Sequence, residues 1–403
     1  MSDMIELNGR CYRKPLRPTV VVCADGCDPE YIERGIADGV FPTIASFARR
    51  GYLGTADAVL PTFTNPNNVS IVTGAPPSVH GIAGNYYLER ESGREIMMTD
   101  ERLMRSETIL ALMARAGVKT AAITAKDKLR KLLGRNLDGI CFSSECADRE
   151  TETLVGRGRP DMYSADLSLF VLDAGIALVE RGAATLLYLS LSDYVQHAHA
   201  PGAPEADGFN GALDDRVRRF VELGAVVGLV ADHGMNDKAK PDGAPNVIFL
   251  EDELNGRFGD GSVRVICPIT DPFVRHHGAL GSFVRGYARN AGDIRPLMAA
   301  SAALPGVALV LDGADAARRF ELPLDREADF VALGDANTAI GASCAEHDLS
   351  GLAGHRLRSH GGLGEQLVPF ILSQPLTPEY RDIAATRRLR NFDIFDFALN
   401  GVA

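Results

Sequence analysis

Three apolar segments of this chain each end in an aspartate. They are PTVVVCAD, ending at Asp25, TLLYLSLSD, ending at Asp193, and VVGLVAD, ending at Asp232. His197 follows Asp193 by four positions, and His233 follows Asp232 directly. A single aspartate at the end of a strand is usually a helix cap or a turn former. Three carboxylates brought together away from water would instead be costly, and divalent cations would turn that cost into binding energy.

A third histidine, His360, lies in the loop RSHGG just before a late apolar segment. Aspartate and histidine together suit Zn²⁺ best, and Mn²⁺ or Fe²⁺ are alternatives. The sequence therefore predicts a metal site. We expect the remaining histidines to be surface or loop residues outside this site: His80, His199, His347 and His355.

The segment PTFTNPNNVSIVTG (61–74) offers a nucleophile, Thr64. Pro66 suits the first turn of a helix with Asn65 as its cap, which would place Thr64 just outside the helix N-terminus. Backbone N–H groups and the helix dipole favour an anion there. A threonine hydroxyl is a weak acid, but coordination to a metal lowers its pKa. From spacing alone, a simple turn residue is an equally good interpretation of Thr64.

A cluster of cations follows the apolar segment 118–124. It is the sequence TAKDKLRKLLG, with Lys126 and Lys128 nearest the end of the predicted strand. If the strand belongs to a parallel sheet, these lysines lie at the same edge as the aspartates. The alternative is an ordinary solvated start of a helix.

The elements that must position these residues alternate between short apolar strands and amphipathic helices. Strands are predicted at 19–24, 118–124, 185–191 and 226–231, and helices after Asp28 and at 108–117, 164–181 and 211–223. This alternation predicts an α/β fold with a mostly parallel sheet flanked by helices on both faces. The pattern becomes mixed after residue 250 and returns at 365–373. We therefore predict a catalytic core of residues 1–250 and 356–403 with an inserted mixed α+β cap domain at 251–355.

Composition limits the function classes. Lys and Arg number 42 against 53 Asp and Glu, a net charge of −11, which argues against binding to nucleic acid or to an anionic membrane. The 7 cysteines lack zinc-ribbon spacing, so we expect buried thiols. Neither a signal peptide nor a bilayer-spanning apolar run is apparent, which predicts a cytoplasmic protein.

The segments VCADG, PTFTNPNNVSIVTG, HGIAGNYY, SDYVQH, ADHGM and RSHGG, in this order, resemble the alkaline phosphatase superfamily, within it the nucleotide pyrophosphatase/phosphodiesterase branch. The resemblance implies an alkaline phosphatase-like core with two Zn²⁺ ions per chain. It also implies roles for residues. One ion would be held by Asp25, Thr64, Asp232 and His233, and the other by Asp193, His197 and His360. Thr64 would be the nucleophile, and Asn85 of HGIAGNYY would hold a phosphoryl oxygen.

Departures from the family pattern narrow the substrate. The phosphodiesterase branch usually has an aromatic residue after the nucleophile, where this chain has Asn65, which disfavours a nucleotide. The C/S-x-P-x-R motif of sulfatases is absent at Thr64. A threonine nucleophile also differs from the serine of the phosphoglycerate mutase relatives.

The stretch around Lys126 and Lys128, and DPFVRHHGALGSF (271–283), are similar instead to members of this branch that hydrolyse phosphonoacetate. The implied reaction cleaves the carbon–phosphorus bond to acetate and phosphate through a phosphothreonine on Thr64. Lys126 and Lys128 would bind the substrate carboxylate. Contact of the cap residues Arg275, His276 and His277 with substrate stays open.

Two other functions are compatible with the same residues. One is a phosphodiesterase or phosphomonoesterase with an oxygen leaving group, and the other is a non-catalytic phosphonate-binding relative. In each case the expected partner is a small molecule, with neither nucleic acid nor membrane, and a homodimer is compatible with the sequence.

Overall fold

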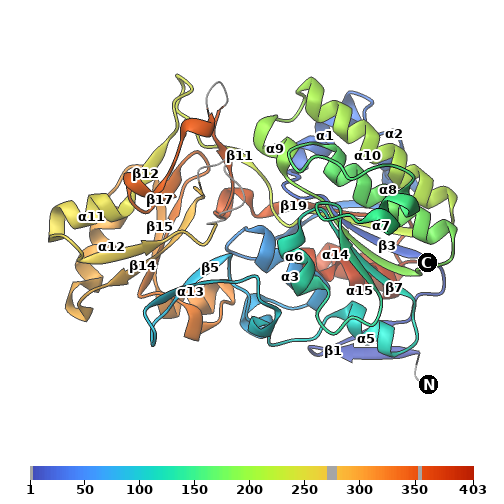
Figure 1. The fold of residues 1–403 in the computed structure, drawn as a ribbon, viewed down its shortest axis with the longest axis horizontal. Coiled ribbons are helices and arrows are strands. Elements are labelled where there is room, and N and C mark those ends of the chain that lie inside the picture. The colour runs from blue at the N-terminus through green and yellow to red at the C-terminus, as the bar shows by residue number, and fades with distance from the viewer. Residues whose placement is uncertain (1–2, 270–278, 353–355) are drawn as a thin grey trace.

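The computed structural model describes residues 3–269, 279–352 and 356–403 and has two lobes (Figure 1). The larger lobe contains a seven-stranded sheet. In spatial order its strands are β4 (Tyr52–Asp57), β19 (Leu367–Leu372), β10 (Val226–Val230), β3 (Thr19–Cys23), β9 (Leu186–Ser190), β7 (Thr120–Thr124) and β8 (Ile140–Ser143). All pairs from β10 to β8 are parallel, and β19 is antiparallel to both of its neighbours. The predicted mostly parallel sheet is confirmed.

Helices cover both faces of this sheet. Its central strands are therefore buried along their whole length, which explains why they are continuous apolar runs. On one face lie α1 (Pro29–Ala37), α2 (Pro42–Arg50), α8 (Asp166–Glu180) and α10 (Pro204–Glu222). On the other lie α3 (Thr64–Thr73), α5 (Ile109–Arg115), α6 (Asp127–Leu133) and α15 (Ile394–Asn400). The shorter α7 (Arg149–Val155) packs on α8, and α14 (Pro378–Thr386) on α15.

Local signals explain where some of these helices begin. Asp28 caps α1, because its Oδ1 accepts a hydrogen bond from the backbone N–H of Glu30 at 2.9 Å, and Pro29 occupies the first helical position, as predicted. The prediction for α10 was wrong at its start. This helix begins at Pro204 rather than at residue 211, and buries Ala206 and Phe209 in the added turns.

The smaller lobe is built on an antiparallel sheet of four strands. Their order is β13 (Val263–Ile266), β14 (Phe283–Ala288), β16 (Phe330–Gly334) and β15 (Val307–Asp312). The helices α11 (Leu250–Phe258), α12 (Ile294–Ala302) and α13 (Gly313–Phe320) pack on it and enclose a second hydrophobic core. This lobe occupies the region predicted as a mixed α+β cap, and the exact domain limits stay a prediction.

Short paired strands lie around and between the two sheets. They are β1 (Met4–Leu7) with β2 (Arg10–Arg13), β5 (Tyr86–Glu89) with β6 (Arg94–Met97), β11 (Asn236–Asp237) with β18 (Arg358–Ser359), and β12 (Val247–Phe249) with β17 (Ala339–Gly341). The pair β11–β18 matters for the site, because it holds the segment after His233 beside the segment before His360. Among the described residues, every helix is too short or too polar to cross a bilayer.

Candidate active site

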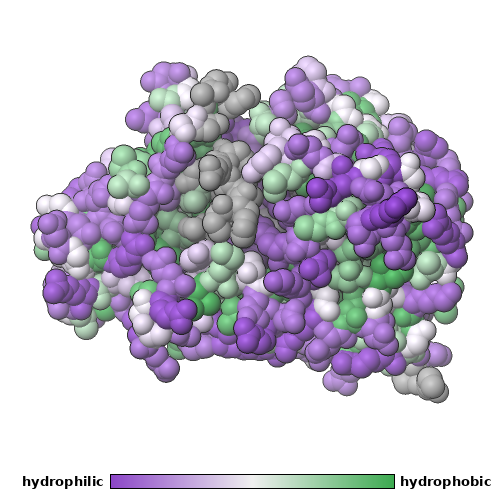
Figure 2. Space-filling view, in the orientation of Figure 1, coloured by the Kyte–Doolittle hydropathy of each residue, from purple (hydrophilic) through white to green (hydrophobic). Residues whose placement is uncertain are grey.

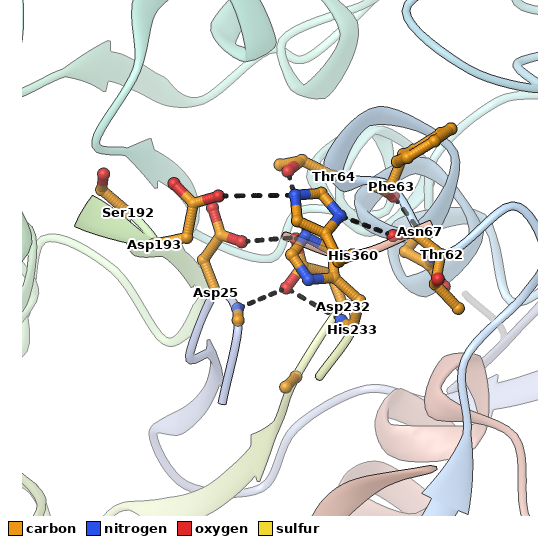
Figure 3. Close-up of polar contacts among 12 residues, drawn as sticks. Asp25, Thr62, Phe63, Thr64, Asn67, Ser192, Asp193, Asp232, His233 and His360 are labelled. Atoms are coloured by element: carbon orange, nitrogen blue, oxygen red, sulfur yellow. Dashed lines mark hydrogen bonds and ion pairs between the residues drawn. The ribbon is translucent and has the colours of Figure 1, made fainter. Parts of the chain in front are cut away.

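The three predicted aspartates follow three neighbouring strands of the large sheet. Asp25 lies just beyond β3, Asp193 beyond β9 and Asp232 beyond β10, and all three side chains are buried. Because these strands are parallel, their carboxyl ends share one edge, and the carboxylates converge there (Figure 3). Two sets of side chains have ligand atoms within 4.8 Å of one another: Asp25, Asp193 and His233, and Asp193, His197 and His360.

The three histidines share one orientation. Nδ1 faces a backbone carbonyl oxygen in each: that of Arg358 for His197 (2.8 Å), Gly234 for His233 (2.9 Å) and Thr62 for His360 (2.7 Å). A carbonyl oxygen only accepts hydrogen bonds, so Nδ1 carries a proton in every case. The other ring nitrogen, Nε2, then faces the centre of the site. Histidine ligands of metals are oriented in this way.

These Nε2 atoms lie against carboxylate oxygens. That of His197 lies 3.0 Å from Asp193 Oδ2, and that of His233 lies 3.3 Å from Asp25 Oδ1. A ring nitrogen with a lone pair and a carboxylate oxygen repel each other at this distance unless a proton or a metal cation lies between them. The arrangement therefore requires positive charge at its centre.

The carboxylates themselves point to the same need. Neither oxygen of Asp25 accepts a hydrogen bond from any residue in the described part of the chain. Burial, together with Asp193 and Asp232, raises the pKa of Asp25 well above its usual 3.8. Burial also raises the pKa of Asp232 to about 6. The charged form of these groups is unfavourable without a cation, and aspartate with neutral histidine is a donor set that Zn²⁺ prefers. The residues fit a divalent metal.

Thr64 also lies at this centre. It is the first residue of α3, and its Oγ1 lies 3.3 Å from His233 Nε2 (Figure 3). The prediction that Asn65 caps the helix was wrong: the N-cap is Phe63, and Asn65 Nδ2 donates to the carbonyl oxygen of Met98 at 3.3 Å. Thr64 is therefore the first residue inside the helix rather than just outside it, and its hydroxyl still lies at the N-terminus of a ten-residue helix, next to His233.

Asn85 precedes β5 and is buried. Its Nδ2 donates to the carbonyl oxygen of Ile269 at 3.3 Å, and its Oδ1 has no hydrogen-bond partner among the described residues. Its backbone oxygen accepts from Met98, the residue that Asn65 also contacts. Asn85 is thus linked through Met98 to the start of α3. Its contact with a phosphoryl oxygen stays a prediction.

Lys126 and Lys128 lie at the start of α6, at the carboxyl edge of β7. Lys126 Nζ donates to Asp193 Oδ1 at 2.7 Å. Both lysines line a cavity of about 320 Å³ whose wall also includes Ser192 and Tyr194, on either side of Asp193. The structure therefore brings Lys126 into contact with Asp193, one of the predicted metal ligands, and places Lys128 in the wall of the adjoining cavity.

Some predictions about other residues were wrong or lie outside the structure. His80 is fully buried rather than at the surface: its Nε2 lies 2.8 Å from Ser70 Oγ of α3, and burial lowers its pKa to about 3. His347 is a loop residue, as predicted, although it is buried, and its Nε2 accepts a hydrogen bond from the N–H of Ala342 at 2.9 Å. Four residues discussed from the sequence fall outside the described residues: Arg275, His276, His277 and His355.

Comparison with known proteins identifies the family. Residues 19–270 match the type I phosphodiesterase / nucleotide pyrophosphatase family. The chain belongs to this family. Murine ectonucleotide pyrophosphatase / phosphodiesterase 5, solved in complex with AMP, is 16% identical with a TM-score of 0.65 over 96% of each chain, which shows a common fold.

Other members are far more similar. Two crystal structures of phosphonoacetate hydrolase from Sinorhizobium meliloti 1021, in complex with phosphonoformate and with phosphonoacetate, are each 44% identical, with a TM-score of 0.94 and 100% of both chains covered. Phosphonoacetate hydrolase of Penicillium oxalicum is 66% identical over 29 residues, which are 7% of this chain and 40% of that relative. Within the type I phosphodiesterase family the chain thus groups with phosphonoacetate hydrolases, as its motifs predicted.

Proposed function

We propose that this protein hydrolyses phosphonoacetate to acetate and phosphate with two Zn²⁺ ions per chain. Its full-length similarity to a phosphonoacetate hydrolase supports the substrate. The observation that carries the proposal is the contact between the two halves of the site: Lys126, which also lines the adjoining cavity, bonds to Asp193 of the metal-ligating cluster. A carboxylate-binding group thereby adjoins a phosphoryl-binding group, as a carboxyphosphonate requires.

The proposed ligands divide between two ions. One would be held by Asp25, Thr64, Asp232 and His233, and the other by Asp193, His197 and His360. When bound, such ions act as Lewis acids that neutralise phosphonate charge and lower the pKa of a coordinated hydroxyl. Mn²⁺ or Fe²⁺ are expected to substitute in the same ligand set.

Thr64 is proposed as the nucleophile. The hydroxyl loses its proton as Oγ1 attacks phosphorus and a P–O bond forms, and the carbon–phosphorus bond breaks with its electron pair moving to the carboxymethyl group. That group leaves as an enolate and takes a proton to become acetate. Water then attacks the phosphothreonine and the bond between phosphorus and Oγ1 breaks. One proton of the water restores the threonine hydroxyl, and phosphate is released. Asn85 is proposed to hold a phosphoryl oxygen.

The two lysines are proposed to assist the departure of the carbon leaving group. A carbon leaving group departs poorly unless its charge spreads into the carboxylate, so cations at the carboxylate stabilise the enolate as it forms. Lys128, in the cavity wall, and Lys126, beside Asp193, are proposed for this role. The interaction strengthens as negative charge reaches the carboxylate, and it therefore acts on the chemical step as well as on binding.

Product release tests the proposal: phosphate is measured for phosphonoacetate, and p-nitrophenolate is measured for the two esters. The zinc-loaded protein is compared on phosphonoacetate, p-nitrophenyl phosphate and a p-nitrophenyl phosphodiester, with chelator-treated protein as the control. We expect the highest kcat/KM on phosphonoacetate and its loss after chelation. A preference for either ester would make the protein an esterase of the same family, and zinc binding without turnover of any substrate would make it a phosphonate-binding relative. Cytoplasmic location and a homodimer stay predictions.

A further inference from the structure

One fully buried amide lies between the nucleophile and a proposed metal ligand, outside the ligand set itself. Asn68 is one turn beyond Thr64 on α3. Its Nδ2 donates to the backbone oxygen of Thr64 at 3.0 Å and to Asp232 Oδ2 at 3.1 Å. Its Oδ1 accepts from Tyr188 Oη at 2.7 Å and from Ser190 Oγ at 2.8 Å. All four hydrogen-bonding positions of the amide are therefore used.

The chemistry of these partners fixes the orientation of the amide. A backbone carbonyl and an ionised carboxylate only accept hydrogen bonds, so the NH₂ group of Asn68 must face Thr64 and Asp232. The hydroxyls of Tyr188 and Ser190 can donate, so both are directed at the amide oxygen. A flipped amide would place its oxygen against two acceptors. The side chain thus has one stable orientation.

The same contact fixes the orientation of Asp232. Its Oδ1 accepts from the backbone N–H groups of Gly26 at 3.3 Å and His233 at 3.1 Å, and its Oδ2 accepts from Asn68. Each carboxylate oxygen has two lone pairs, so the remaining one on Oδ2 is directed away from Asn68. The same Oδ2 lies 3.7 Å from His233 Nε2. Asn68 thereby determines which lone pair of Asp232 is available to a cation.

We infer that Asn68 is a positioning residue that holds the nucleophile's helix and the Asp232 carboxylate in a fixed relation, so that Thr64 and Asp232 address the same cation. The inference rests on the proposed metal-dependent function. Tyr188 and Ser190 belong to β9, and the chain just beyond β9 carries Asp193, which is a member of both candidate ligand groups. The amide of Asn68 therefore also connects Thr64 and Asp232 to this strand. Residues that orient a metal ligand in this way typically contribute 10- to 100-fold to affinity or activity.

The test replaces Asn68 by leucine, which keeps the approximate shape and removes every hydrogen bond. The matched control is Asn67→Leu. Asn67 is the neighbouring buried amide of α3, and its partners, among them Val59 and Asn391, lie outside the ligand set. Zn²⁺ affinity is measured by competition with a chromophoric chelator, and Co²⁺-loaded protein reports ligand geometry through its visible absorption spectrum.

We expect Asn68→Leu to weaken one of two Zn²⁺ sites by about 10- to 100-fold, to change the Co²⁺ spectrum, and to lower kcat more than it changes KM. Asn67→Leu should lower thermal stability while the folded protein keeps its Zn²⁺ affinity and Co²⁺ spectrum. Unchanged Zn²⁺ affinity and spectrum in Asn68→Leu, or equal losses in both variants, would overturn the inference.

A milder variant covers the case in which Asn68→Leu does not fold. Tyr188→Phe combined with Ser190→Ala leaves the amide in place but removes the two donors that fix its orientation. A smaller loss of Zn²⁺ affinity in the same direction supports the inference, and wild-type affinity contradicts it. Because Zn²⁺ binding needs no phosphonate, these results decide the role of Asn68 even if the protein proves inactive on phosphonoacetate. Absence of Zn²⁺ binding in the wild type would instead contradict the proposed function.

Discussion

Lys126 Nζ lies 2.7 Å from Asp193 Oδ1, so a proposed substrate-binding lysine contacts a proposed metal ligand directly. The other oxygen of this carboxylate faces His197 Nε2 at 3.0 Å, and Asp193 belongs to both groups of candidate ligands. A change at Lys126 therefore reaches the metal centre as well as the substrate carboxylate. Lys128 lines the adjoining cavity, so the two lysines should be separable by experiment.

We predict that Lys128→Ala lowers kcat/KM on phosphonoacetate by about ten- to a hundredfold, the value of one hydrogen bond to a charged group. Its effect on p-nitrophenyl phosphate, which lacks the carboxylate, should be much smaller. Lys126→Ala should lower activity on both substrates, because it also removes the contact with Asp193. The control is Lys131→Ala, which changes an exposed lysine of the same cavity wall. Equal losses on both substrates for Lys128→Ala would contradict a carboxylate-binding role.

Thr64→Ala should keep the fold and abolish turnover, because it removes the attacking hydroxyl and little buried volume. Thr64→Ser should keep part of the activity, since a primary hydroxyl at the start of α3 can attack phosphorus in the same way. Stopped reactions with labelled substrate should show phosphate covalently bound to the wild type and to the serine variant only. Near-normal turnover by Thr64→Ala would mean that water attacks directly.

The central sheet and the metal-ligand candidates could be predicted from the sequence, because both follow from short-range patterns. A buried strand of a parallel sheet is a continuous apolar run, and its polar ending marks the ligand edge. The runs ending at Asp25, Asp193 and Asp232 met both conditions. In the structure Asp25 and Asp193 belong to one candidate ligand group, and Asp232 lies beside His233 of that group. The sheet also contains β19, and no local pattern in the sequence indicates that this strand runs antiparallel to both of its neighbours.

Other features depend on long-range packing and could not be predicted. Gly208 and Gly211 weaken the helical pattern before residue 211, yet α10 begins at Pro204, a residue type that suits the first helical position, and its added turns bury Phe209 in the core. His80 was predicted to be a surface or loop residue. Its burial and its hydrogen bond with Ser70 depend on packing against α3, which no local pattern indicates. Lys126 was predicted at the substrate, but its contact with Asp193 arises from β7 and β9 being neighbours.

Metal content provides a third prediction. Asp232→Ala and His360→Ala each remove a ligand from a different proposed ion, so elemental analysis of either variant should show roughly one ion lost or weakened per chain. Each loss should lower activity strongly, since both proposed ions would act on the same phosphonate. His199→Ala, which changes a half-buried histidine near Glu205, is the control. Two ions at full occupancy in both ligand variants would contradict the assignment.

Asp25 should make the metal-free chain less stable as pH rises. Its pKa is raised in the folded state by burial, so its contribution to stability is fully present below the unfolded pKa near 3.8 and is lost as pH rises through the folded value. His360 acts in the opposite direction, because burial lowers its pKa, and its contribution increases with pH up to about 6.5. The difference between wild type and Asp25→Asn isolates the aspartate.

Urea unfolding in the presence of chelator measures this difference. As pH rises from about 3.8 through the raised folded pKa of Asp25, the wild type should lose stability relative to Asp25→Asn. With Zn²⁺ in excess the order should reverse, because the metal binds the ionised carboxylate and stabilises the folded state. If the stability difference between the two proteins in the presence of chelator does not change with pH, then other groups of the metal-free chain stabilise the charged form of Asp25.

The last prediction concerns Lys238 and Glu365, an ion pair with both side chains fully buried and 2.7 Å between Nζ and Oε1. Lys238 Nζ also donates to the backbone oxygen of Ala336 in the smaller lobe at 2.8 Å. Glu365 Oε2 accepts from the backbone N–H of Gly362 at 3.0 Å, two residues beyond His360. The pair thus joins the smaller lobe to the loop of a proposed metal ligand.

Removing one partner leaves an uncompensated buried charge, so Lys238→Met and Glu365→Gln should each lower the free energy of unfolding by about 3–5 kcal/mol. The double variant Lys238→Met/Glu365→Gln should lose much less than the sum of the single losses, because neither charge remains. Urea unfolding of the wild type, the two single variants and the double variant gives the double-mutant cycle. As a control, Arg218→Ala at the exposed Arg218–Glu222 pair should change the free energy of unfolding little. Additive losses would mean that the two side chains stabilise the fold independently. Restored stability with lowered Zn²⁺ affinity in the double variant would show that the pair also positions the loop of His360.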